Sequence, residues 1–201
     1  MTILHRIRIR GFMKKNVFRM PTPIKITGRT SSITNAFVNG IIPVVEPTEA
    51  EIDDALATLG MTRESICCAY CGDTCTEWDH FRPLIVDKGP TGYISEIHNL
   101  VPACGKCNQS KGNKEWKKWM YSDASLSPKT RGITDINERC RKLEVYERKY
   151  APTKLDFVEI VGEELWEKHW NNHEKLLELM KTCQETSDEI KERITMSLRN
   201  E

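Results

Sequence analysis

The stretches CAYC (68–71) and CGKC (104–107) decide the fold of this chain, and 32 residues separate them. Each Cys-x2-Cys turn lets two thiolates reach one ion, and four thiolates close the tetrahedral coordination sphere of a structural zinc. Zinc binding of this kind contributes directly to the free energy of folding. We therefore predict one structural Zn²⁺ bound by Cys68, Cys71, Cys104 and Cys107.

Two further cysteines, Cys67 and Cys75, compete for the same role, because a Cys-x3-Cys spacing can also hold zinc. Gly72 directly after the first pair and Gly105 inside the second favour the assignment above. In a secreted chain the eight cysteines would suit disulfides. The N-terminus, however, interleaves charges with its apolar residues and has no signal-peptide core, so we expect a reducing cytoplasmic location and metal-binding cysteines.

The segment between the two cysteine pairs contains two runs of mixed apolar and polar residues, at 76–85 and 93–101, with turn residues at 87–92. These runs predict two strands, and a helix is predicted over 108–119, directly after the second pair. The expected order is strand, strand, helix, with zinc connecting the two ends.

The motifs of this segment, in their order and spacing, resemble the HNH endonucleases of the ββα-metal class. The motifs are CxxC, Asp79-His80, Asn99-Leu100 and CxxCN followed by Lys111-Gly112, within residues 68–119, about a quarter of the chain. The resemblance implies an α+β fold in which a zinc site connects the two ends of the HNH core. It also implies metal-dependent hydrolysis of DNA that leaves 5′-phosphate and 3′-hydroxyl ends.

The same resemblance implies a role for four polar residues. His80 is the general base, Asp79 and Asn108 hold a catalytic Mg²⁺ or Mn²⁺, and Asn99 orients the His80 ring. Asn108 stands where the family name has its final histidine, which leaves the metal preference open. The chemistry supports these roles, because a neutral imidazole can take a proton from water. A hard cation held by carboxylate and amide oxygens keeps positions open for a phosphate.

Asp79 and His80 are neighbours on a predicted strand, so regular geometry points their side chains to opposite faces. We therefore expect a β-bulge or a strong twist near Asp79, which would bring both side chains to one phosphate. His98 is the rival base, but on a regular strand its side chain lies opposite that of Asn99, which favours His80.

The net charge of +1 hides an uneven distribution along the chain. Residues 1–45 carry +8, 46–103 carry −8, 104–131 carry +5 and 132–201 carry −4. Cationic segments beside an acidic block are typical of nucleic-acid surfaces, and the resemblance to HNH endonucleases implies double-stranded DNA as the partner. The predicted phosphate contacts are Arg82, Lys106, Lys111 and Lys114, whereas Lys117 and Lys118 equally suit a solvated helix face.

We divide the chain into a basic N-terminal arm (1–45), a helix with the nuclease core (46–122) and a C-terminal helical region (123–201). The arm alternates arginine and isoleucine over 6–10, which predicts a short cationic strand or a solubilising tail. No apolar run approaches the roughly 18 residues of a membrane helix.

Sequence signals place three helices outside the core. Thr48 and Glu51 have the spacing of a capping box and predict a helix that ends at Gly60. Further helices are predicted from residue 136 to Pro152 and over 163–198. In the last of these, His169 and His173 have metal-binding spacing, but their aromatic neighbours favour ordinary helix-face histidines.

The leading hypothesis is that the protein is a restriction or defence endonuclease, for instance a type II restriction endonuclease. A double-strand cut with one active site per chain would require two copies, so a homodimer is a candidate assembly. One alternative is a zinc module that binds nucleic acid without cleaving it. Another is a structural zinc protein with a helical oligomerisation tail, which leaves Asp79, His80 and Asn99 unexplained.

Overall fold

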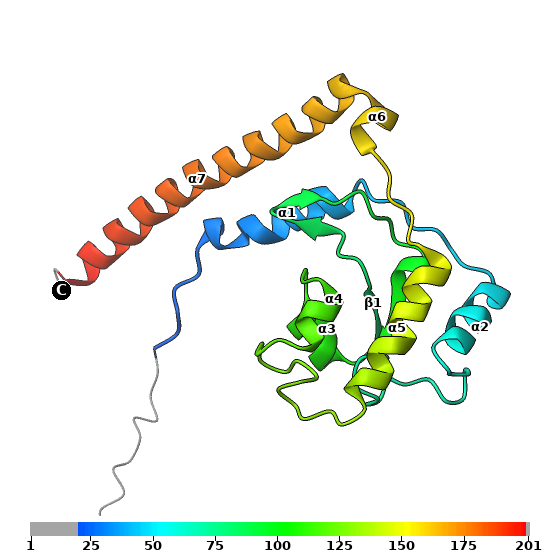
Figure 1. Ribbon diagram of the computed structural model, residues 1–201. Helices are drawn as coiled ribbons and strands as arrows, with labels where there is room; N and C mark the ends of the chain where they lie inside the picture. The colour runs from blue at the N-terminus through cyan, green and yellow to red at the C-terminus, as the bar shows by residue number, and fades with distance from the viewer. Residues whose placement is uncertain (1–19, 200–201) are drawn as a thin grey trace, which may run out of the picture.

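A computed structural model of the chain describes residues 20–199, so the strand expected over 6–10 lies outside the described residues. Many helices and two small sheets confirm the α+β class (Figure 1). The elements in chain order are η1 (Ile26–Arg29), α1 (Thr30–Asn39), α2 (Glu49–Thr58), β1 (Glu77–His80), β2 (Ile85–Val86), β3 (Gly89–Pro90), η2 (Ile97–Asn99), β4 (Leu100–Ala103), α3 (Gly105–Lys111), α4 (Trp116–Met120), α5 (Ile136–Tyr150), α6 (Phe157–Val161) and α7 (Glu163–Arg199).

Local capping signals set the ends of several helices. The predicted capping box is present at α2, where the Glu51 backbone N–H donates to the Thr48 hydroxyl and the Thr48 N–H donates to the Glu51 carboxylate. Gly60 follows this helix with φ +74°, a conformation that favours glycine. The helices predicted from residue 136 and over 163–198 are confirmed as α5 and α7.

The hairpin between the two cysteine pairs is shorter than its sequence pattern predicts. Strand β1 stops at His80, because His80 pairs with Leu100, the first residue of β4, and the residues before Leu100 form the 3-10 helix η2. The second predicted run, 93–101, is mostly turn and 3-10 helix, and β4 begins only at Leu100. The pairs β1–β4 and β2–β3 form two separate antiparallel sheets. Both predicted strand lengths were therefore wrong, while the order strand, strand, helix is correct.

The single helix predicted over 108–119 is two helices. Helix α3 ends at Lys111 because Gly112 adopts φ +50° and ψ −126°, which is outside helical geometry. Helix α4 starts again at Trp116, where the Glu115 carboxylate accepts hydrogen bonds from two backbone N–H groups. Trp116 and Trp119 are almost fully buried, and the Trp116 ring stacks on Phe81 with centroids 4.9 Å apart.

The described residues form two hydrophobic clusters. The larger one joins α2, α4, α5, the β1–β4 hairpin and both cysteine pairs, and its most buried aromatic residues include Tyr70 and Tyr146. Figure 1 shows α5 and α2 on one side of β1 and helices α3 and α4 on the other. Helix α5 belongs to the region that we assigned to the C-terminus, yet it completes this core. The division into three regions stays a prediction.

The second cluster connects α1 and the β2–β3 hairpin with the segment that leads into α7, and Val38, Ile42, Leu84 and Ile94 form its centre. Helix α7 runs along α1 as a long rod (Figure 1). His169 Nε2 lies 3.1 Å from the Phe37 carbonyl oxygen, and His173 Nε2 lies 3.0 Å from the Thr34 hydroxyl. Both histidines are therefore ordinary helix-packing residues, as predicted. Within residues 20–199, no helix has the length and apolar composition needed to cross a membrane.

Candidate active site and metal centre

The four cysteines predicted as zinc ligands lie together, with all their sulfur atoms within 4.8 Å of one another. Cys71 Sγ and Cys104 Sγ are 3.7 Å apart. Zn–S bonds of about 2.3 Å in a tetrahedron require a sulfur–sulfur separation of nearly this size. All four cysteines are buried, so the cluster fits a closed structural zinc site. Across residues 20–199, no other group of three or more His, Cys, Asp or Glu side chains converges in this way.

Backbone hydrogen bonds shape both cysteine turns. The Gly72 N–H donates to the Cys68 carbonyl at 2.8 Å, and Gly72 has φ +78°. In the second turn, Cys104 is the N-cap of α3. The side chain of Arg131 donates to Cys107 Sγ at 3.4 Å, and a hydrogen bond from Cys107 lowers the pKa of the Cys71 thiol. Hydrogen bonds with Cys68 and Cys71 raise the pKa of Cys107, so Cys71 is the thiol that these contacts favour as a thiolate, the form that binds zinc.

The rival ligands lie outside this cluster. The Cys75 thiol donates to the backbone oxygen of Glu77 at 3.3 Å, and Cys67 forms an isolated β-bridge with Thr74. All eight cysteines fall within the described residues, and all are free of disulfide bonds. The Cys-x2-Cys assignment is the one that the geometry supports.

Asp79 points into the core and is only 4% exposed. Its carboxylate accepts a hydrogen bond from the Tyr70 hydroxyl at 2.6 Å and pairs with the Lys111 ammonium at 3.0 Å. Burial raises the pKa of Asp79, and the Lys111 charge opposes this shift; burial also lowers the pKa of Lys111. Because Tyr70 lies inside the first cysteine turn, this buried network connects the metal cluster to β1.

The bulge predicted near Asp79 is absent. Strands β1 and β4 pair residue for residue, from Glu77 opposite Ala103 to His80 opposite Leu100. The prediction was wrong because it assumed that Asp79 and His80 must turn to one side. In the structure, Lys111 from α3 satisfies the inward-facing Asp79 carboxylate, and a regular strand then directs His80 to the other face.

His80 is half-buried and held at two points. Its ring nitrogen Nε2 lies 2.9 Å from the Ser95 hydroxyl, and its carbonyl oxygen accepts a hydrogen bond from the Lys111 ammonium at 2.7 Å. Burial lowers the pKa of His80, and the nearby Lys111 charge lowers it further. The ring is therefore neutral at neutral pH and has a lone pair available to accept a proton.

Asn99 is fully buried and contacts the backbone, not the His80 ring. Its Oδ1 accepts a hydrogen bond from the Arg82 N–H at 2.7 Å. Its Nδ2 donates to the carbonyl oxygens of Arg82 and Ile94, both at 3.1 Å. The orienting role implied for Asn99 stays a prediction. Asn99 could act on His80 only through the backbone that it binds, at Arg82 and Ile94.

Asn108 lies in the first turns of α3, and its Nδ2 donates to the Glu77 carboxylate at 2.8 Å, which leaves its amide oxygen available. Glu77 and Asp79 alternate on β1 and share one face. Glu77, Asp79 and Asn108 thus offer oxygen atoms, which is the donor type that Mg²⁺ or Mn²⁺ prefers. Asp79 would have to share its carboxylate with Lys111. The sequence analysis did not single out Glu77, although the two-residue alternation of a strand puts it on the same face as Asp79.

The four basic residues predicted to contact phosphate have different surroundings. Lys111 is fully buried against Asp79, so its assignment as a phosphate contact was wrong; the pattern gave no sign that its partner would be a core carboxylate. Arg82 is paired with Glu147. Lys106 and Lys114 are exposed, and Lys106 lies 3.7 Å from a carboxylate oxygen of Asp73.

His98, the rival base, faces a different part of the core. Its ring lies parallel to Tyr150 of α5, with centroids 4.9 Å and planes 13° apart. This stacking contact gives His98 a packing role, while His80 lies beside Ser95 and Lys111. The structure therefore favours His80 over His98 as the candidate base.

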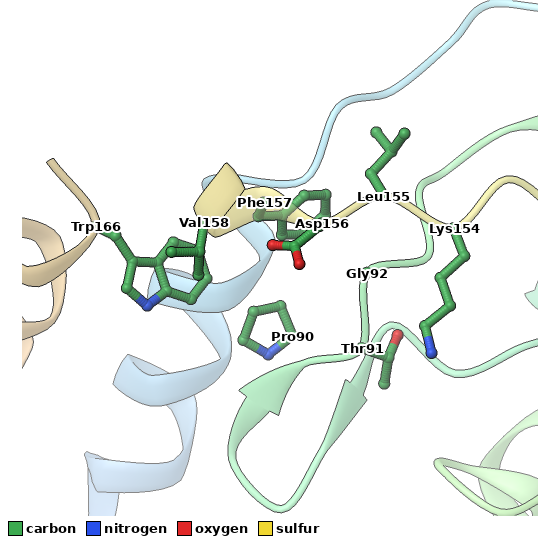
Figure 2. A pocket seen from close by; sticks show the side chains of 9 residues that line it. All are labelled: Pro90, Thr91, Gly92, Lys154, Leu155, Asp156, Phe157, Val158 and Trp166. Atoms are coloured by element: carbon green, nitrogen blue, oxygen red, sulfur yellow. The ribbon is translucent and has the colours of Figure 1, made fainter. Parts of the chain in front are cut away.

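Two hollows of about 430 Å³ lie near the β2–β3 hairpin. Figure 2 shows the first, with Trp166 at one side, Lys154 at the other, and Pro90 and Asp156 between them. None of the cysteine ligands or candidate catalytic residues lines it. The second hollow shares Thr91 and Lys154 with the first and extends to Arg82, two residues after His80.

These features define a ββα unit with a four-cysteine metal cluster and a half-buried histidine. The sequence profile of the family described as HNH endonuclease matches residues 68–114, so the chain carries an HNH endonuclease domain there. Over 61 residues, the chain is 41% identical to the CRISPR-associated endonuclease Cas9 of Corynebacterium diphtheriae (strain ATCC 700971 / NCTC 13129 / Biotype gravis). That similarity covers 28% of this chain and 5% of Cas9. No solved structure matches the chain.

Proposed function

We propose that this protein is a metal-dependent DNA endonuclease in which His80 is the general base and Asp79 and Asn108 hold a Mg²⁺ or Mn²⁺ ion. The observation that carries this proposal is the half-buried His80 ring, whose Nε2 lies 2.9 Å from the Ser95 hydroxyl at one end of the hairpin, while the four-cysteine cluster lies at the other end. The HNH endonuclease domain at 68–114 and the similarity to Cas9 support it.

The chain's own residues prepare the attack of water on a phosphodiester. His80 accepts the proton of the attacking water, and its lowered pKa keeps the ring in the neutral form that this step needs. Lys111 binds both the Asp79 carboxylate and the His80 carbonyl oxygen, so it holds the backbone of the base beside the ligand. Because the two side chains lie on opposite faces of β1, a bound phosphate has to lie at the end of the strand to meet both. A divalent ion bound by Asp79 and Asn108 would stabilise negative charge on the phosphate and on the leaving 3′ oxygen.

The biological role that we propose is that of a restriction or defence nuclease acting on double-stranded DNA in the cytoplasm. The uneven charge along the chain supports a DNA partner, with Lys106 and Lys114 as exposed phosphate contacts. Eight free thiols suit a reducing compartment. Cutting both strands would take two active sites, so we propose a homodimer on the target site, with Zn²⁺ in the cysteine cluster of each chain.

Plasmid cleavage tests this proposal. The purified protein, incubated with supercoiled plasmid and Mg²⁺ or Mn²⁺, is expected to nick or linearise it, and EDTA is expected to stop the reaction. His80→Ala should slow cleavage by about 10²- to 10⁴-fold, the usual contribution of a general base. His98→Ala is the matched control and should stay within about twofold of the wild type. Equal activity of His80→Ala and the wild type would contradict the proposal.

One observation favours a second candidate, a zinc module that binds nucleic acid without cleaving it. The Asp79 carboxylate already has two buried partners, Tyr70 and Lys111, and so needs no metal to be satisfied. This candidate predicts that the protein shifts labelled DNA in a gel but leaves it intact with every divalent ion tested. It also predicts that His80→Ala binds DNA as the wild type does.

A further inference from the structure

We infer that Ser95 is the residue that orients His80: its hydroxyl oxygen accepts a hydrogen bond from the Nε2–H group of the ring, which leaves Nδ1 as the basic atom. The inference rests on the proposed function and deepens it, because it states which nitrogen takes the proton from water. Ser95 is a positioning residue, since it acts through His80. No sequence motif pointed to it.

The contacts of the His80 ring distinguish its two nitrogens. Nε2 lies 2.9 Å from the Ser95 Oγ atom. Nδ1 has no hydrogen-bond partner among residues 20–199, and no buried side-chain nitrogen in that part of the chain lacks a partner. Nδ1 therefore reaches solvent. A neutral imidazole has one N–H and one lone pair, so His80 can be a base toward water only when the proton sits on Nε2.

The backbone of Ser95 is fixed by a segment outside the HNH match. The Ser95 N–H donates to the Pro43 carbonyl at 3.1 Å, and the Ser95 carbonyl accepts a hydrogen bond from the Val45 N–H at 2.8 Å. Val44 and Ser95 form a parallel β-bridge. Because both backbone groups are held, the hydroxyl has a defined position from which to fix the ring plane. The segment 43–45 thus supports the candidate active site from outside residues 68–114.

Asn99 holds the two sides of the Ser95–His80 contact together. Its side chain binds the backbone of Arg82, two residues after His80, and the carbonyl of Ile94, one residue before Ser95. One buried amide thus spans the segments that carry the base and its partner. The orienting role that the family resemblance implies for Asn99 is then exercised through Ser95.

The tautomer of His80 tests the inference without any need for cleavage. Nitrogen-15 NMR of the histidine rings, with His80→Ala to assign the His80 signals, is expected to show the proton on Nε2 in the wild type. Ser95→Ala is expected to give a mixture of both tautomers, while Ser95→Thr, which keeps a hydroxyl, restores the Nε2–H form. Ser32→Ala, at an exposed serine of α1, is the matched control and should change nothing. A wild-type ring with its proton on Nδ1 would overturn the inference.

Kinetics provide the second readout. Ser95→Ala is expected to lower kcat about 10- to 100-fold, a part of the contribution of a general base, and to leave KM for DNA unchanged. Ser95→Thr should recover most of the rate. Ser95→Cys keeps the side-chain volume with a much weaker hydrogen-bonding group and should resemble Ser95→Ala, so it replaces that variant if Ser95→Ala does not fold.

The two proposals fail in different ways. If the wild type cleaves no DNA but its His80 tautomer depends on Ser95, the proposed function fails while the orienting role of Ser95 stands. If Ser95→Ala and Ser95→Cys keep both the wild-type tautomer and the wild-type kcat, the role assigned to Ser95 is wrong while the nuclease proposal stands.

Discussion

The two ends of the β1–β4 hairpin are built in different ways. At the end that starts with Glu77 and finishes with Ala103, the metal ligands come from two short turns, each with two cysteines three residues apart. At the His80 end, each polar group depends on a distant segment, such as Ser95, Ile94 or Lys111. The metal end is an assembly of local motifs, whereas the candidate catalytic end is a product of the tertiary structure. The two ends should therefore respond differently to substitution.

The largest effect is expected at the metal end, for Cys107→Ser. Structural zinc in small finger domains contributes an apparent binding free energy of about 10–16 kcal/mol, and removing a buried thiolate opens the site. We expect loss of zinc, measured by elemental analysis, and loss of the cooperative unfolding transition, measured by circular dichroism. Cys75→Ser is the control and should keep both, because Cys75 lies outside the cluster. If Cys107→Ser still held one zinc ion per chain, the assignment of Cys107 as a zinc ligand would be wrong, and so would the contrast between the two ends of the hairpin.

A smaller effect is expected for Lys111→Met, which acts on the link between the two ends. It leaves the buried Asp79 carboxylate with the Tyr70 hydroxyl alone, and breaking a buried ion pair costs about 3–5 kcal/mol. Urea unfolding should show this loss. Lys117→Met removes a surface ion pair with Glu144 and should cost about 1 kcal/mol or less.

Adding Asp79→Asn to Lys111→Met removes the unpaired charge and should recover part of the lost stability. This double variant separates the electrostatic effect from a packing effect of the lysine stem. If it is no more stable than Lys111→Met alone, the buried charge is not the cause of the loss.

The smallest effect on stability is expected at the catalytic end, for Asn99→Ala. The substitution leaves the Arg82 N–H and the carbonyls of Arg82 and Ile94 without their side-chain partner. A buried polar group left unsatisfied costs about 1–3 kcal/mol, and loop relaxation toward water should keep the total near about 2 kcal/mol. Zinc content should be unchanged, and the His80 tautomer should be disturbed as in Ser95→Ala. Asn39→Ala, at an exposed residue of α1, is the control and should stay within about 0.5 kcal/mol.

The outcome of the sequence predictions follows the same division. The cysteine turns, the capping box at Thr48 and the ends of α5 and α7 could be predicted, because each depends on residues a few positions apart. The strand lengths and the continuous helix over 108–119 were wrong, because the 3-10 helix at Ile97–Asn99 and the backbone conformation at Gly112 end elements that the hydrophobic pattern would continue. The hydrophobic period of a segment predicts that an element is present, but a local backbone conformation decides where the element ends.

The sequence by itself determined which residue types are present for the chemistry: four thiols in two turns, an Asp-His pair and two asparagines. Only the tertiary structure decided which partner each one has, including Lys111 for Asp79 and Ser95 for His80. The physical reason is the separation along the chain. A turn of four residues has few conformations, so its spacing determines its geometry. The two cysteine turns meet across 33 residues because one tetrahedral ion requires four thiolates, whereas the Lys111–Asp79 pair spans 32 residues with no such fixed ligand set and depends on packing.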